Sequence, residues 1–104
     1  MPWDTNGLLS SSPSGTVLAD TGALNALANT FTAWLYSEQG TGYYVELQHR
    51  NAANTATLNS QILYLKSGEV GQQFPFTLTM GLNERLRLTL TSSMTDTVQG
   101  SLIR

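Results

Sequence analysis

The sequence predicts an all-β protein, an antiparallel β-sandwich of the jelly-roll or tulip-like type with an extended N-terminal arm. From residue 30 onward, apolar and polar residues alternate with the period of two that is typical of strands. The alternating segments are short and are separated by turns rich in Gly, Asn and Ser, and no segment has a convincing helical pattern. A chain of 104 residues is long enough for one modest core, so we expect a single domain.

The first 15 residues, "MPWDTNGLLSSSPSG", are predicted to form the arm, because Pro and Gly interrupt them throughout. Their large apolar side chains are Trp3, Leu8 and Leu9. Residues 16–104 are predicted to form the sandwich domain. It begins with a strand, a turn at residues 20–22 and a short irregular bridge.

Six alternating segments follow: 30–37, 43–50, 57–65, 73–80, 85–92 and 97–104. The clearest is "RLRLTLTS", which places Leu86, Leu88 and Leu90 on the core face and Arg85 and Arg87 on the outer face. In "QFPFTLTM" a proline stands inside the pattern. Because proline cannot donate a ladder hydrogen bond, this segment is predicted to be an edge strand or to contain a bulge.

The segment "YYVELQHRNAAN" gathers an acid, a base and a cation, as an active site would. In strand register, however, His49 shares a face with Val45 and Leu47, whereas Glu46 and Arg50 point the opposite way. We therefore interpret His49 as a structural residue at the rim of the core, and predict that the protein is not an enzyme.

Composition disfavours several other classes of function. The net charge is −2 with five Lys and Arg residues, so the basic stripe of a nucleic-acid-binding protein is absent. No apolar run is long enough to span a membrane, and the N-terminus does not resemble a secretory signal. One histidine, no cysteine and seven scattered acids give no metal-ligand spacing, and we expect no cofactor and no metal.

Three aromatic residues, Trp34, Tyr36 and Tyr44, are predicted to face outward together on neighbouring strands. They could form a second buried layer beneath a loop or the arm, a stacking platform for sugar rings, or a subunit interface. We favour the interface, because the low charge of the chain and the apolar residues of the arm also favour contact with another protein.

Arg85 and Arg87 share one strand face next to Glu84, and two interpretations stay open. They lie on a solvated face with a cross-strand partner such as Glu46 or Glu69, or they make a charged contact with a partner protein.

The runs "VELQHRNAANTATLNSQILYL" and "NERLRLTLTSSMTDTVQGSL" resemble the small decoration, or cement, proteins that stud the capsids of tailed bacteriophages. The resemblance covers roughly residues 16–104. It implies a homotrimer that binds the major capsid protein on the outer capsid surface and stabilises contacts between capsomers, after assembly in the host cytoplasm. It also implies that an extended arm, here with Trp3, Leu8 and Leu9, reaches the capsid or a neighbouring subunit. Under the second interpretation above, Arg85 and Arg87 also contact the capsid or a neighbour. The alternative is a carbohydrate- or receptor-binding module, for example on a phage tail.

Overall fold

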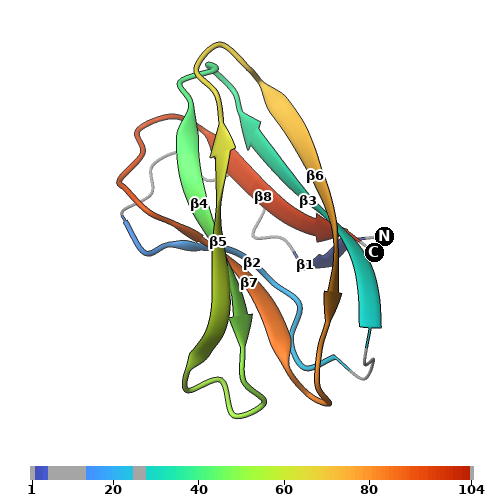
Figure 1. Ribbon diagram of the computed structural model, residues 1–104. Helices are drawn as coiled ribbons and strands as arrows, with labels where there is room; N and C mark the ends of the chain where they lie inside the picture. The colour runs from blue at the N-terminus through green and yellow to red at the C-terminus, as the bar shows by residue number, and fades with distance from the viewer. Residues whose placement is uncertain (1, 5–13, 25–27, 104) are drawn as a thin grey trace.

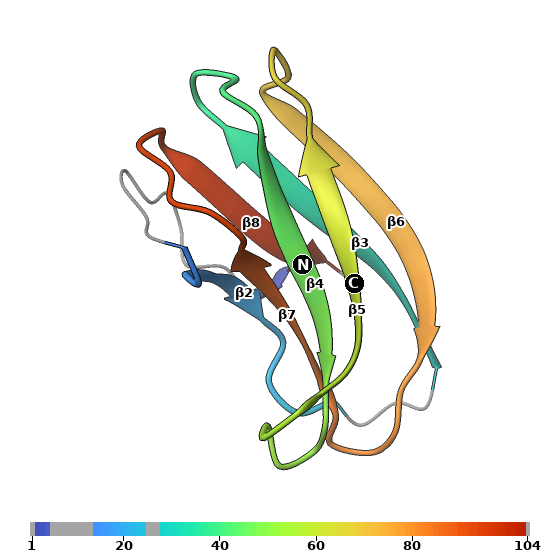
Figure 2. The same ribbon diagram turned by 60° about the vertical axis from the view of Figure 1, so that its left-hand side comes forward.

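The computed structural model describes residues 2–4, 14–24 and 28–103, which form eight β-strands in two antiparallel sheets (Figure 1). The strands are β1 (Pro2–Asp4), β2 (Val17–Asp20), β3 (Ala28–Ser37), β4 (Tyr43–Arg50), β5 (Thr57–Leu65), β6 (Gly71–Thr79), β7 (Arg85–Leu90) and β8 (Val98–Ile103). Turned by 60°, the molecule shows the two sheets facing each other (Figure 2). The predicted antiparallel β-sandwich is confirmed.

The strand order is that of a jelly roll. One sheet has the order β1-β8-β3-β6 and the other β2-β7-β4-β5. Only β4 and β5 are consecutive strands in the same sheet. Each of the remaining connections along the chain passes from one sheet to the other. Eight strands wound in this way satisfy the jelly-roll pattern, which is found in viral capsid and lectin domains.

The core lies between the sheets and is built by the predicted alternation. On β7, Leu86, Leu88 and Leu90 are buried, while Arg85 and Arg87 point outward. The sheets approach closely at β8, because a Cβ added to Gly100 would lie 2.9 Å from the Cβ of Leu18 on β2. Glycine is thus required at residue 100 by packing.

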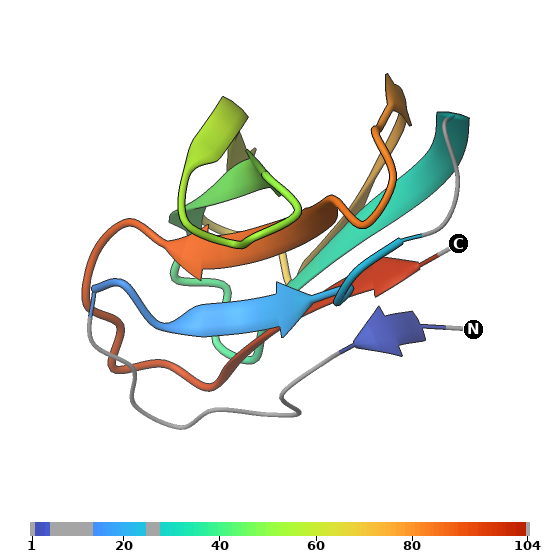
Figure 3. The ribbon, with the colours of Figure 1, turned by 90° about the horizontal axis from the view of Figure 1, so that it is seen from below.

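The sandwich is less tightly closed along the side formed by β5 and β6, the edge strands of the two sheets. Seen from below, the two sheets diverge on this side (Figure 3). The inward side chains of β6, which are Phe74, Phe76 and Leu78, are only partly buried. The position of β6 confirms the prediction from Pro75 that this segment is an edge strand.

The chain crosses between sheets after β3, and a buried carboxylate holds this connection. Asp96 is 2% exposed and accepts hydrogen bonds from the Ser37 hydroxyl and from the backbone N–H groups of Gln39 and Thr97. Burial alone would raise the pKa of Asp96, but these hydrogen bonds, led by that of Ser37, outweigh it and lower the pKa. The crossing is therefore stabilised by an ionised carboxylate that has little contact with solvent.

Part of the predicted arm belongs to the domain. Pro2–Asp4 forms the short edge strand β1, which pairs with β8 in the register Pro2↔Ile103 and Asp4↔Leu102. The backbone of Trp3 therefore lies against its own sheet and does not extend away from it. Leu8 and Leu9 lie outside the described residues.

Candidate functional site

The three aromatic residues predicted to form one outward patch lie on two different faces of the molecule. Trp34 and Tyr36 are on β3, whereas Tyr44 is on β4 in the other sheet. The prediction of a single patch is wrong, because residues 37–43 carry the chain across the sandwich and do not form a hairpin within one sheet. The outward orientation of the three side chains was predicted correctly, but their proximity to one another was not.

Trp34 and Tyr36 lie on the outer face of the β1-β8-β3-β6 sheet and are half-buried. Their rings stack with centroids 5.5 Å apart and planes at 13°. The Trp34 ring also covers Gly71 on β6, where an added Cβ would lie 3.6 Å from the indole. Because an aromatic ring shields the bare backbone of a strand glycine, this pair stabilises its own sheet.

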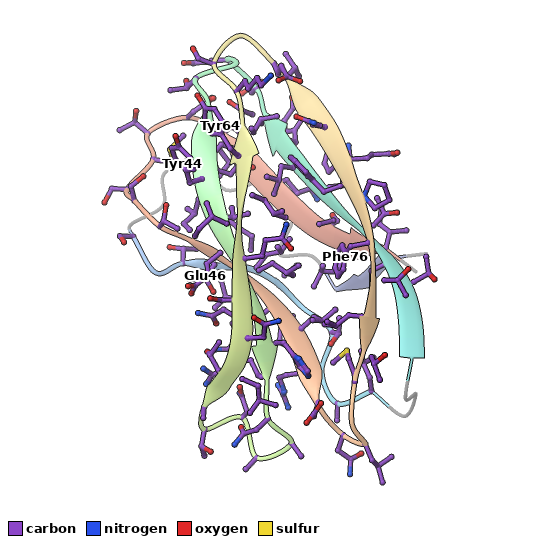
Figure 4. All side chains as sticks on the ribbon, in the orientation of Figure 1. Tyr44, Glu46, Tyr64 and Phe76 are labelled. Carbon is purple, nitrogen blue, oxygen red and sulfur yellow. The ribbon has the colours of Figure 1, made fainter. Side chains whose placement is uncertain are left out.

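Tyr44 instead pairs with Tyr64 on the outer face of β4 and β5. The two residues are direct cross-strand partners, with ring centroids 4.3 Å apart and planes at 16°. Ile62 lies two residues before Tyr64 on β5, opposite Glu46. Figure 4 shows the two tyrosines together on neighbouring strands, with Glu46 further along β4.

We call Tyr44, Ile62 and Tyr64 the tyrosine patch. Their exposed fractions are 48%, 53% and 39%, which are high for large apolar side chains. Sequence reasoning missed Ile62 and Tyr64 as candidate site residues. The signal was present in "ILYL", because four successive large apolar residues in a strand must place two of them on the outer face.

Arg85 and Arg87 of β7 form ion pairs with a residue that was not expected as their partner. Arg85 and Arg87 both approach Asp20 of β2, with Arg85 Nη1 at 3.5 Å and Arg87 Nη2 at 3.2 Å from Asp20 Oδ2. The expected cross-strand partner, Glu46 or Glu69, forms no ion pair with either. Arg50 of β4 lies directly opposite Arg85 on the same outer face, so three guanidinium groups gather there.

His49 points toward the core rim, as predicted, and has a partner that sequence reasoning did not assign. Its Nε2 lies 2.7 Å from Oε1 of Glu84. The same oxygen also accepts a hydrogen bond from the backbone N–H of Gly81. The hydrogen bond from Gly81 and then that of His49 lower the pKa of Glu84. Glu46 and Arg50 point away from this pair, so the segment 43–54 does not assemble an acid, a base and a cation.

A small cleft of about 90 Å³ opens beside His49 between the two sheets. It is lined by Leu47, Leu78, Leu86 and Phe76, with Asn59 and Gln61 among the polar residues of its lining. The two sheets do not close over this cleft on the side of β5 and β6. Figure 4 shows Phe76 on β6, across from β5. The cleft is well below the roughly 300 Å³ at which small-molecule pockets begin.

The described part of the chain contains no group of three or more His, Cys, Asp or Glu residues placed to hold a metal ion. Within the same residues, no helix is long and apolar enough to cross a membrane. The outer face of the β2-β7-β4-β5 sheet carries the tyrosine patch and three arginines, and it is the candidate site.

Comparison with known proteins identifies relatives of the fold. No family model matches the chain, and no curated protein matches it. Among solved structures, CBM4, a carbohydrate-binding module, is similar with a TM-score of 0.56 and 14% identity, over 80% of this chain and 55% of that one.

An exo-β-1,3-galactanase from Phanerochaete chrysosporium, solved with galactose, is similar with a TM-score of 0.56 and 10% identity. A variant of the same enzyme with β-1,3-galactotriose gives 0.54 and 11%. This chain spans 29% of the length of the galactanase chains and about half of the carbohydrate-binding module. These similarities show the fold alone.

Proposed function

We propose that the protein is a decoration protein of a tailed-bacteriophage capsid, a structural module that binds the outer surface of the shell and stabilises contacts between capsomers. The observation that carries the proposal is the tyrosine patch, an apolar surface exposed on a sheet face that also presents Arg85 and Arg87. The resemblance of residues 16–104 to such proteins supplies the partner, the major capsid protein. Tyr and Arg are among the residue types that are enriched at protein–protein interfaces.

The location of these residues supports a docking face on one side of the sandwich. The sequence predicts Tyr44 in a subunit interface, and Arg85 and Arg87 in a capsid contact. All three lie on the outer face of the β2-β7-β4-β5 sheet. A contact there needs area and shape complementarity but no chemistry, and it stabilises the assembled shell by mass action.

Self-association as a homotrimer is part of the proposal, with the Trp34–Tyr36 pair as the subunit contact. The two aromatic pairs lie on opposite outer faces, so one interface cannot bury both. Contacts between opposite faces of successive copies give a closed ring only if the rotation between copies closes, and otherwise give open stacks. We assign the trimer contact to the Trp34–Tyr36 face, an arrangement that leaves the tyrosine patch for the shell.

Co-sedimentation with purified capsids tests the proposal. Ile62→Ser should weaken attachment by about tenfold or more, as for a residue inside a contact, without unfolding the domain. Leu82→Ser is the matched control, because Leu82 is 62% exposed but lies in the β6–β7 turn. If the wild-type protein does not attach to capsids, or if both variants weaken attachment equally, the proposal is wrong.

A carbohydrate-binding module is the second candidate, favoured by the surroundings of the tyrosine patch. Next to Tyr44 on the same strand, Gln48 donates a hydrogen bond to Glu46, so polar groups that could bind hydroxyls adjoin aromatic rings. The similar solved structures include a carbohydrate-binding module and a galactanase. A glycan array, with β-1,3-galactotriose among the probes, decides it: saturable binding lost in Tyr44→Ala would favour this candidate over the decoration protein.

A further inference from the structure

Three arginines from two strands form a positively charged group on the outer face of the β2-β7-β4-β5 sheet. We call Arg50, Arg85 and Arg87 the arginine cluster. Arg50 and Arg85 are direct cross-strand partners, a placement in which like charges repel. Asp20 forms ion pairs with Arg85 and Arg87, and no other ion pair reaches the cluster within the described residues. Three of the five Lys and Arg residues of an acidic chain are thus gathered at one place.

The β4–β5 loop holds two of these guanidinium groups in position. Asn54 Oδ1 accepts hydrogen bonds from Arg50 Nε at 3.0 Å and from Arg87 Nη2 at 3.2 Å. Arg50 also donates to the Asn54 carbonyl at 3.1 Å and to the Thr57 hydroxyl at 2.8 Å. Asn54 has a φ of 55°, the left-handed conformation that asparagine tolerates better than most residues. The side chains are therefore fixed before any partner binds.

Several guanidinium N–H groups remain for a ligand. A guanidinium has five N–H donors, and Arg50 uses three of them in the contacts above. Arg87 donates from Nε to Asp20 and from Nη2 to Asn54, and its Nη2 also lies 3.2 Å from Asp20 Oδ2. The Arg85 side chain is 25% exposed, but its Nε is buried and cannot reach a surface ligand, so Arg85 can bind one only through its terminal nitrogens. Fixed guanidinium groups with unused donors match the two oxygens of a carboxylate or phosphate.

We propose that the arginine cluster is an anion-binding site that receives the carboxylates of an acidic segment on a partner protein. It rests on the proposed function, since it specifies the chemistry of the surface to which this sheet face docks. A protein ligand is favoured over nucleic acid, because the same sheet face carries the tyrosine patch toward the other end of β4 and because three arginines with Asp20 among them neutralise few phosphates. Tyr44 and Ile62 supply a separate apolar contact further along the same face.

Titration of the purified protein with a peptide of ten glutamates tests the site without a capsid. Arg50→Gln and Arg87→Gln should each weaken binding by about tenfold, the ratio for one lost charge-assisted hydrogen bond. Arg50→Lys keeps the charge but loses the planar fork, so it should give a smaller loss. The control is Lys66→Gln, which removes a cation just beyond the end of β5, away from the cluster, and should change binding by less than about twofold.

An equal loss in Arg50→Gln and Lys66→Gln would show a nonspecific charge effect and overturn the site. Inorganic phosphate that displaces the peptide at equal concentration would overturn the assignment to protein carboxylates. Absence of peptide binding by the wild-type protein also refutes the site, even if capsid attachment succeeds. If peptide binding shows the expected pattern but capsids are not bound, the anion site stands and the decoration function fails.

Discussion

Removal of the Asp96 carboxylate should be among the more damaging single changes in this protein. Asp96 is 2% exposed and accepts hydrogen bonds from Ser37, Gln39 and Thr97, which belong to the end of β3 and the segment before β8. Asp96→Ala leaves these donors without an acceptor at the point where the chain crosses between sheets. Each hydrogen bond to a charged group contributes about 1.5 to 3 kcal/mol, and shared donors are not additive.

We therefore expect Asp96→Ala to lower the free energy of unfolding by about 3 kcal/mol. For a domain of this size, that corresponds to a fall in melting temperature of roughly 10 to 20 °C. Urea denaturation followed by tryptophan fluorescence measures it, with the m-value as a check on two-state behaviour. A loss below about 1 kcal/mol would refute the conclusion that this carboxylate holds the crossing.

The pH dependence supplies a second test of the same residue. The pKa of Asp96 is lowered in the folded protein, so its contribution to stability is fully present above the usual aspartate pKa of about 3.9. That contribution is lost as the pH falls through the lower folded-state pKa. Asp96→Asn lacks this titration, so the stability difference between wild type and variant should shrink below about pH 4. A difference that stays constant down to pH 2 would contradict the lowered pKa.

Three further changes have distinct expected outcomes. Gly100→Ala should cost about 1 to 3 kcal/mol by thermal unfolding, because the new methyl group would overlap Leu18; an unchanged melting temperature would contradict this. Trp34→Ala should weaken self-association in light scattering and also lower stability by uncovering Gly71, whereas a wild-type monomer at high concentration would exclude the trimer. His49→Gln should change stability by less than about 1 kcal/mol, since glutamine can keep the hydrogen bond, and a complete loss of function in a folded variant would revive an active site there.

The faces of the strands could be predicted well from the sequence. Leu86, Leu88 and Leu90 are buried as expected, and the proline of β6 correctly marked an edge strand. His49 was correctly separated from Glu46, because alternation in a strand is a local property with a period of two residues. Neighbouring residues in the chain are sufficient to set it.

The composition of each surface could not be predicted in the same way, because strand pairing joins residues that are far apart in the chain. Nothing in the alternation of β3 and β4 indicates that they belong to different sheets, which separates Trp34 from Tyr44. The sequence by itself therefore determined the strands, their inner faces and the all-β class. Only the tertiary structure decided that Tyr64 joins Tyr44 and that Arg50 joins Arg85, because burial of both inner faces selects which strands become neighbours.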